Sequence, residues 1–325
     1  MLANFDYARA TSVTDAIEQC RADGAVFHAG GTDLLGCLMD GVFTVRKVVA
    51  LSRLNELRGI EQSADGGLRI GALATLAEIA KSPLVRERWI ALAEAAESAA
   101  SPQLRNQGTL GGNLCQRPRC WYFRGDFDCL RRGGTFCSAM ADGNQYHCIF
   151  GGYGCYMVHP SDTAPALVAL GASVRIVSNN GSRLLPLESF FVLPRQDIRR
   201  ETVLRPGEIL TEVLVPPIPE GLRSTYRKVR SRGSWDFALA GAAVAIQRSG
   251  SRVEYSRIVL SGVAPTPWRS TAAEEAIQGE VLNTGTIVSA AEASVSGARP
   301  LSRNGYKVDL VRGLVAEALR AFALQ

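Results

Sequence analysis

Six of the eight cysteines in this 325-residue chain fall within one short segment, residues 115–155. They are Cys115, Cys120, Cys129, Cys137, Cys148 and Cys155. Such a cluster indicates either a set of disulfide bonds or a metal site. The two-residue C-x-x-C spacing of zinc ribbons and bacterial ferredoxins is missing from it. Three interpretations stay open on spacing alone: four thiolates around a [4Fe–4S] cluster, a zinc site, or free or disulfide-bonded thiols.

The same segment carries aromatic and basic side chains that would suit an iron–sulfur cluster. The aromatic ones could shield a cluster from water, and the arginines could offset its negative charge. These residues are Trp121, Tyr122, Phe123, Phe127 and Phe136, with Arg117, Arg119, Arg124, Arg131 and Arg132. The two remaining cysteines, Cys20 and Cys37, lie on apolar helical stripes, and we expect them in the core.

A glycine-rich turn at residues 28–35 could bind an anion. Gly30 and Gly31 follow an apolar strand-like run, and a helix is expected after them. Glycines let a backbone approach a ligand closely, and helix N-terminal N–H groups attract negative charge, so a pyrophosphate would suit the site. A plain tight turn is the alternative. The chain contains no G-x-G-x-x-G fingerprint, which removes support for a Rossmann-type nicotinamide site.

A second glycine-rich stretch, residues 105–114, reads RNQGTLGGNL. Gly108, Gly111 and Gly112 open the backbone, while Thr109 and Asn113 offer side-chain hydrogen bonds. Two such loops suit a ligand with phosphates in its middle and a ring at each end, although a second ordinary turn is the alternative. Farther along, residues 226–236 form a basic cluster that could reach a bound anion or could end a solvated strand.

Periodicity and capping signals place these motifs on a mixed α and β framework. We predict strands at 25–28, 47–51, 67–72, 173–177, 213–215, 240–246 and 253–263, and helices at 12–23, 90–100, 164–170 and 309–324. Thr75 and Glu78 have the spacing of a capping box and predict a further short helix. Residues 101–112 are predicted as a turn. The Pro- and Gly-rich run 216–221 is the expected domain boundary.

Length and composition limit the class of protein. A chain of 325 residues suggests two or three domains. The net charge of +5 is spread along the chain without a basic, aromatic-rich run, so nucleic acid is not an expected partner. We find no signal peptide and no membrane span, and we expect a cytoplasmic protein, periplasmic only by co-export with a partner subunit. Disulfides are uncommon in the cytosol, which favours metal for the cysteines.

Taken together, these motifs resemble the FAD-binding subunit of the molybdenum hydroxylase family, of the xanthine dehydrogenase and aldehyde oxidoreductase type. The resemblance rests on AGGTDLL at 29–35, RNQGTLGGNL at 105–114, HPSD at 159–162, Lys228-x-x-x-Arg232-x-x-x-Asp236, and YKVDL at 306–310. It implies an α+β fold: a two-part FAD-binding domain of the vanillyl-alcohol-oxidase type at 1–217, then a smaller α/β domain at 221–325 like that of carbon monoxide dehydrogenase flavoproteins.

The resemblance also implies which residues contact FAD. The first loop would hold the pyrophosphate by backbone N–H groups, the second would wrap the diphosphate and ribityl region, and three further positions would contact the flavin. In this sequence these residues are Phe27, His28, Ala29, Gly30, Gly31, Thr32, Asp33 and Leu34, then Thr109, Leu110, Gly111, Gly112 and Asn113, and finally Asp162, Leu210 and Lys228.

One departure from the usual pattern is a long insertion, residues 115–157, between the second loop and the Ser161–Asp162 pair. It is similar to the insertion of a subgroup, including 4-hydroxybenzoyl-CoA reductase and certain bacterial aldehyde oxidoreductases, whose flavin subunit carries an extra [4Fe–4S] cluster. The local contexts match that subgroup at Cys120, Cys129, Cys137 and Cys155. Cys115 and Cys148 are then spare thiols.

The implied function is electron transfer without substrate chemistry on this chain. A molybdopterin-containing large subunit would act on the substrate. A small subunit with two [2Fe–2S] clusters would exchange electrons with the FAD here, and the FAD with an external acceptor or donor. The alternatives are a stand-alone flavin oxidoreductase of the same fold and a non-redox zinc protein.

Overall fold

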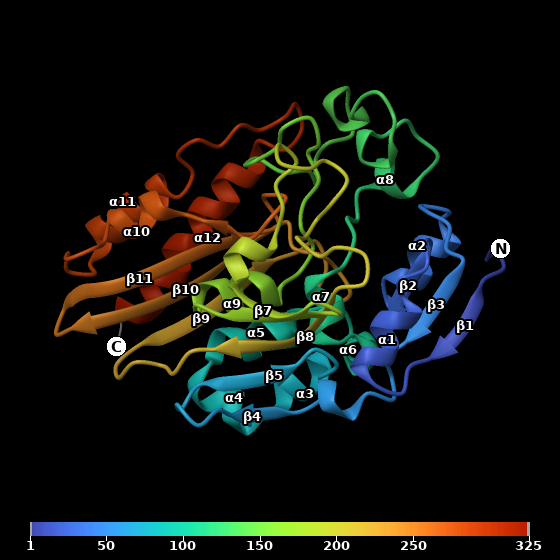
Figure 1. The fold of residues 1–325 in the computed structure, drawn as a ribbon. Coiled ribbons are helices and arrows are strands. Elements are labelled where there is room, and N and C mark those ends of the chain that lie inside the picture. The colour runs from blue at the N-terminus through green and yellow to red at the C-terminus, as the bar shows by residue number, and fades with distance from the viewer. Residues whose placement is uncertain (1, 324–325) are drawn as a thin grey trace.

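The computed structural model describes residues 2–323 as three sheets with helices packed between and around them (Figure 1). The first sheet is parallel and has the strand order β1–β3–β2. Its elements are β1 (Asp6–Arg9), α1 (Val13–Gln19), β2 (Ala25–His28), α2 (Leu34–Met39) and β3 (Lys47–Ala50). The strand–turn–helix–strand arrangement predicted around the first glycine loop is therefore present as β2–α2–β3.

The second sheet joins segments that are far apart in the sequence. Its order is β4 (Ile60–Gln62), β5 (Leu68–Gly71), β8 (Ile209–Val215), β6 (Ser173–Ser178) and β7 (Gly181–Pro186), all antiparallel. After β5 the chain leaves this sheet at residue 72 and returns to it only at β6, so residues 72–172 form a long excursion. The second glycine loop, residues 105–114, and the cysteine segment lie in that excursion.

The third sheet has helices on both faces. It comprises β9 (Arg223–Val229), β10 (Ala240–Ser249), β11 (Arg252–Ser261) and β12 (Trp268–Arg269). Along β10, Val244 packs with α10 (Thr271–Glu275), α11 (Thr284–Ala293) and α12 (Tyr306–Ala323), while Ala243 packs toward α5 (Ile90–Ser98) and α9 (Thr163–Ala169). Because both faces are covered, the buried part of β10, residues 240–246, is apolar without interruption.

The remaining helices lie between residues 76 and 124, and they include parts of the second glycine loop and of the cysteine segment. They are α3 (Leu76–Lys81), α4 (Pro83–Arg88), α6 (Pro102–Gln107), α7 (Leu110–Leu114) and α8 (Trp121–Arg124), with short 3-10 turns at Asn55–Leu57, Leu130–Arg132, Ser138–Met140 and Leu187–Phe190. The cysteine segment projects at the upper right of Figure 1, and its Phe123 packs with Cys37 of α2.

Most predicted elements are confirmed, including the α+β class and the capping box at Thr75–Glu78. The predicted turn over 101–112 is wrong, because it contains α6 and the start of α7. Ser101 and Thr109 cap these helices by accepting from the N–H groups of Leu104 and Gly112. The glycines of this motif favour a turn, which outweighed the capping residues in the sequence-based prediction. Leu324, the last residue of the predicted terminal helix, lies outside the described residues. Between residues 2 and 323, none of the helices has the length and apolarity that crossing a bilayer requires.

Candidate functional site

The two glycine loops lie in backbone contact with each other. Gly31, between β2 and α2, has a φ of +72°, a conformation that side-chain-bearing residues rarely adopt. A Cβ atom at Gly30 would overlap the backbone carbonyl of Gln107, the last residue of α6. The first loop can therefore approach the second only because position 30 is glycine.

The second loop is held in place by side chains on both sides. The Thr109 hydroxyl oxygen accepts a hydrogen bond from the Gly112 N–H at 3.2 Å. Asn113 Oδ1 accepts from the hydroxyls of Ser161 and Thr163, both at 2.6 Å. The second loop and the 159–162 motif are thus joined by hydrogen bonds. The family resemblance assigns both motifs to the flavin site, so this contact agrees with it.

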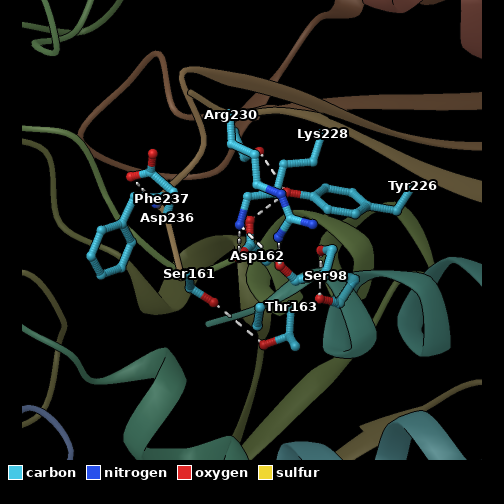
Figure 2. Close-up of polar contacts among 12 residues, drawn as sticks. Ser98, Ser161, Asp162, Thr163, Tyr226, Lys228, Arg230, Asp236 and Phe237 are labelled. Atoms are coloured by element: carbon cyan, nitrogen blue, oxygen red, sulfur yellow. Dashed lines mark hydrogen bonds and ion pairs between the residues drawn. The ribbon is translucent and has the colours of Figure 1, made fainter. Parts of the chain in front are cut away.

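Asp162 belongs to a buried polar network between α9 and the third sheet (Figure 2). Lys228 Nζ lies 2.7 Å from Asp162 Oδ2, and the Tyr226 hydroxyl donates to Asp162 Oδ1 at 2.8 Å. The Lys228 and Asp162 side chains are only 3% and 5% exposed, so each charge depends on the other for compensation. Burial, and then the Asp162 carboxylate, raise the pKa of Tyr226 well above its usual range.

A second contact point is the backbone carbonyl of Ser98 at the end of α5. Lys228 Nζ and Arg230 Nη1 donate to it at 3.2 and 2.9 Å (Figure 2). Strand β9 is thereby anchored to both α5 and α9. The network fixes the third sheet against the elements that carry the glycine loops.

Three adjoining cavities follow these elements. The loop cavity, about 320 Å³, is lined by both glycine loops and by Leu210. The central cavity, about 680 Å³, continues from Thr32 and Thr109 to Asp162 and Phe237. We call the third the histidine cavity; it has about 440 Å³ and lies between His147, His159 and Phe237. Asp162 and Phe237 line both the central and the histidine cavity.

Backbone strain is concentrated at the central cavity. Ala100 and Trp235 line it with φ values of +47° and +55°, and the Trp235 N–H donates to the Ala100 carbonyl at 3.1 Å. A left-handed conformation costs a non-glycine residue roughly 1–2 kcal/mol. Strain of this kind persists where the surrounding structure holds it and is concentrated at functional sites.

The structure brings together most of the sequence-predicted flavin residues. Thirteen of them line the loop or central cavity: Phe27, Ala29, Gly30, Gly31, Thr32, Asp33, Leu34, Thr109, Gly111, Gly112, Asn113, Asp162 and Leu210. His28, Leu110 and Lys228 are not among the lining residues. Leu110 is fully buried in the core, and Lys228 lies against Asp162.

Some residues that line the central cavity are not among the predicted flavin contacts: Gln116, Arg119, Trp235 and Phe237. Of these, Trp235 belongs to the basic cluster 226–236, for which contact with a bound anion is one of the two expectations. Phe237 follows directly on the basic cluster 226–236, so the end of that cluster was a usable signal. From the sequence, Arg119 is expected only as one of the arginines that could offset the negative charge of an iron–sulfur cluster.

Asp33 connects the first glycine loop to the cysteine segment. Its carboxylate accepts from the Arg117 N–H at 2.7 Å and pairs with Arg119 and Arg124 at 3.0 and 2.6 Å. The Arg119 guanidinium lies 5.0 Å from the centre of the Phe237 ring. The Asp33 carboxylate therefore holds the beginning of the cysteine segment beside the loop cavity and the central cavity.

All eight cysteines are free thiols, and five of the six clustered ones are near enough for some of their thiols to raise the pKa of others in the group. Cys129 and Cys137 pair across a short antiparallel bridge. Burial raises the pKa of Cys120 to about 12, and the Cys155 and Cys137 thiols add to this effect. Burial, then Cys155, raises the pKa of Cys148. Cys148, predicted as a spare, therefore lies beside the predicted ligands.

The other cysteines behave differently. Cys115 is separate from the group, and its acidic neighbour is Glu201; burial raises its pKa to about 12. Cys20 and Cys37 are buried in two core clusters, as predicted. Burial raises the pKa of both thiols to about 11.

In the part of the chain that the structure describes, no three His, Cys, Asp or Glu side chains are grouped so that they could hold a metal ion. The Arg131 side chain is fully buried, pairs with Glu201 at 2.6 Å and lies against Cys155.

The chain matches two known protein families in sequence. Residues 3–218 match the family described as the FAD binding domain in molybdopterin dehydrogenase. Residues 224–322 match the family described as the carbon monoxide dehydrogenase flavoprotein C-terminal domain.

Individual proteins are similar over almost the whole chain. The FAD-binding subunit of an aldehyde oxidoreductase from Escherichia coli is 36% identical over 97% of both chains. The carbon monoxide dehydrogenase medium chain of Hydrogenophaga pseudoflava is 28% identical, over 98% of this chain and 96% of its own. A crystal structure of carbon monoxide dehydrogenase from that organism superposes with a TM-score of 0.79 at 27% identity, covering 99% of this chain and 98% of the other.

Proposed function

This chain belongs to the family of FAD-binding medium subunits of molybdenum hydroxylases, and we propose that it binds FAD and relays electrons within such an enzyme. It is an oxidoreductase subunit, as its relatives are. The relay runs between the [2Fe–2S] clusters of a small subunit and an external acceptor or donor. The observation that carries the proposal is the contact of the two glycine loops over a continuous pair of cavities.

The loop and central cavities suit the two halves of FAD. Backbone N–H groups of the 29–34 loop and of residues 109–113 bind the pyrophosphate, where helix N-termini favour negative charge. The apolar residues Phe27 and Leu210 line the loop cavity and receive the adenine end. The ring end occupies the central cavity beside Asp162. When bound, FAD supplies reversible two-electron redox chemistry that these side chains lack.

The residues around Asp162 position the ring rather than react. Tyr226 and Lys228 each occupy one carboxylate oxygen, so Asp162 keeps a fixed orientation and a compensated charge. Lys228 is thereby a positioning residue, which explains why it does not line the cavity. Ala100 and Trp235 line the same cavity in a strained, left-handed conformation.

We propose further that segment 115–157 holds a [4Fe–4S] cluster through Cys120, Cys129, Cys137 and Cys155. Support comes from the convergence of four free thiols, three buried and one half-buried, and from the buried Arg131 cation beside Cys155. Thiolate ligation would overcome the raised pKa values, since a bound metal deprotonates its thiol ligands. The Asp33 contacts then fix this cluster on the same scaffold as the flavin.

The partners in this proposal are a molybdopterin-containing large subunit and a small subunit with two [2Fe–2S] clusters. The assembly is cytoplasmic, with no nucleic acid and no membrane partner. The flavin unit spans residues 1–217 and the C-terminal unit residues 221–325.

One purification tests the proposal. The chain is expressed with its neighbouring reading frames, and the product is analysed for subunits, FAD, iron, sulfide and molybdenum. We expect three polypeptides, one FAD per copy of this chain, and broad iron absorption that dithionite bleaches. Zinc without flavin would contradict the whole proposal, and FAD with iron accounting only for two [2Fe–2S] clusters would contradict the [4Fe–4S] part.

A further inference from the structure

Lys307 is a buried lysine whose ammonium group has no carboxylate partner. It lies in the first turn of α12, in the YKVDL stretch at 306–310, to which the flavin site gives no role. The residue is 0% exposed. Its Nζ donates to the backbone carbonyls of Tyr146 at 3.0 Å and Gly262 at 2.6 Å. Among residues 2–323, no Asp or Glu side chain pairs with it.

Other buried cations of the molecule show the usual arrangement. Arg131 pairs with Glu201 at 2.6 Å, and Lys228 pairs with Asp162 at 2.7 Å. Buried charges in folded proteins are paired or belong to metal sites, because leaving water without compensation is costly. The ammonium group of Lys307 therefore indicates a negative group nearby that the carboxylates of this chain do not supply.

The charged and titratable neighbours of Lys307 belong to the cysteine segment. Burial and then Cys155 raise the pKa of the Cys148 thiol, whereas Lys307 lowers it. Burial and then Lys307 lower the pKa of His147, whose Nε2 lies 3.2 Å from Cys120 Sγ. One neighbour of Lys307 is thus close to the predicted ligand Cys155, and the other contacts the predicted ligand Cys120.

The cysteine segment is held against the start of α12 by a residue other than Lys307. Asn304 is fully buried, and its Nδ2 donates to the backbone carbonyls of His147 at 3.0 Å and Cys148 at 3.1 Å. This contact sets where the segment lies relative to the ammonium group. The charge of Lys307 and the attachment of the segment can therefore be removed separately.

From this geometry we infer that the Lys307 ammonium group compensates the negative charge of the proposed [4Fe–4S] cluster and raises its reduction potential. The inference rests on the proposed function, because it needs that cluster. A [4Fe–4S] cluster with four thiolate ligands is negatively charged, and reduction adds one more negative charge. A fixed cation nearby favours the reduced form over the oxidised form. Helix α12, in the C-terminal family match, thus tunes a cluster whose proposed ligands all lie in segment 115–157.

The reduction potential can be measured on the complete complex by redox titration followed by electron paramagnetic resonance. Lys307→Gln removes the charge and keeps a hydrogen-bond donor, and Lys307→Met removes the charge and keeps an unbranched side chain. Burial lowers the pKa of Lys307 to about 7, so titration at pH 6 compares these variants with a protonated lysine. In both variants the [4Fe–4S] potential should fall by about 59 mV, a tenfold change in the equilibrium constant of a one-electron reduction.

Two matched variants separate charge from structure. Asn304→Ala loses the contacts to the cysteine segment but keeps the ammonium group, so its potential should fall less than that of Lys307→Gln. Arg303→Met removes an exposed cation that is paired with Asp142, and its potential should not change.

The [2Fe–2S] clusters of the small subunit provide an internal reference, since their potentials should be the same in every variant. An unchanged [4Fe–4S] potential in both Lys307 variants, or an equal fall in Asn304→Ala, would overturn the inference. Absence of a [4Fe–4S] signal from the unmodified complex would instead contradict the proposed function.

Discussion

Asp162 and Lys228 lie 66 positions apart in the sequence, yet they form one buried ion pair beneath the central cavity. Replacing Lys228 with Met leaves the Asp162 carboxylate buried without compensation, which costs about 3–5 kcal/mol. We therefore expect a large fall in the free energy of unfolding, measured by denaturant titration. Arg232→Met is the control, because the Arg232–Asp236 pair is exposed and worth under about 1 kcal/mol. Equal losses in both variants would show that Asp162 is not isolated from water.

His159 gives a pH dependence whose sign follows from its burial. Its pKa is lowered from 6.5 to about 4, so the folded protein binds fewer protons than the unfolded chain in that interval. The stabilisation is complete above pH 6.5 and is lost as pH falls toward 4. From pH 7 to pH 5 the unmodified protein should lose about 2 kcal/mol more than His159→Phe. Parallel stability profiles for the two proteins would refute this assignment.

The cysteines allow a direct test of the ligand set. Cys129→Ser should lose iron and keep FAD, because serine removes a predicted cluster ligand and Cys129 itself lines neither the loop cavity nor the central cavity. Cys148→Ser should lose neither, although the Cys148 thiol lies beside Cys155 and Cys137. Iron, sulfide and flavin analysis of both proteins decides the question. Loss of the cluster in Cys148→Ser would mean that Cys148 is a ligand and that the four ligands chosen from sequence context are wrong.

At the scale of elements, the contact between the first glycine loop and the end of α6 is the feature most open to test. Gly30→Ala forces a methyl group onto the Gln107 carbonyl, so the loops must separate. We expect FAD affinity to fall by at least about tenfold and stability by about 1–3 kcal/mol, the usual cost of overpacking. Fluorescence titration with FAD measures the first effect.

Gly313→Ala is the matched substitution for that experiment. Gly313 is exposed on α12 with open space around it. Alanine should stabilise this helix by about 0.5–1 kcal/mol and leave FAD affinity unchanged. A similar loss of FAD in both variants would indicate a general effect of the substitution and not the loop contact.

The whole molecule should respond to FAD as one unit, since the proposed site uses the first sheet, the α6–α7 region and the contacts around Asp162. A ligand that binds only the folded state stabilises it by about 2.7 kcal/mol at a concentration of 100 Kd. Removing FAD should lower Tm, and adding it back should restore Tm. FMN lacks the adenylate half, leaves the loop cavity empty, and should restore less. Equal effects of FMN and FAD would contradict the use of the loop cavity.

The sequence alone determined the features that depend on a few neighbouring residues. The strand Ala25–His28 follows from a short apolar run and the capping box at Thr75 from local hydrogen bonds, and both were predicted. The glycine loops were also predicted, since close backbone approach needs glycine. One local prediction, the turn at 101–112, is wrong. Gly111 and Gly112 are typical of turns, but here they lie in a helix that Thr109 caps.

Only the tertiary structure decided which distant groups meet. The pairing of β5 with β8, the closure of Asp33 on Arg119 and Arg124, and the histidine cavity join segments tens to hundreds of residues apart. Such contacts depend on which layers pack together and on which buried charges come close enough to pair. Both depend on the whole chain, so no short-range sequence pattern predicts them. The sequence thus indicated a flavin site beside a cysteine segment, and the structure identified Asp33 as the residue that joins them.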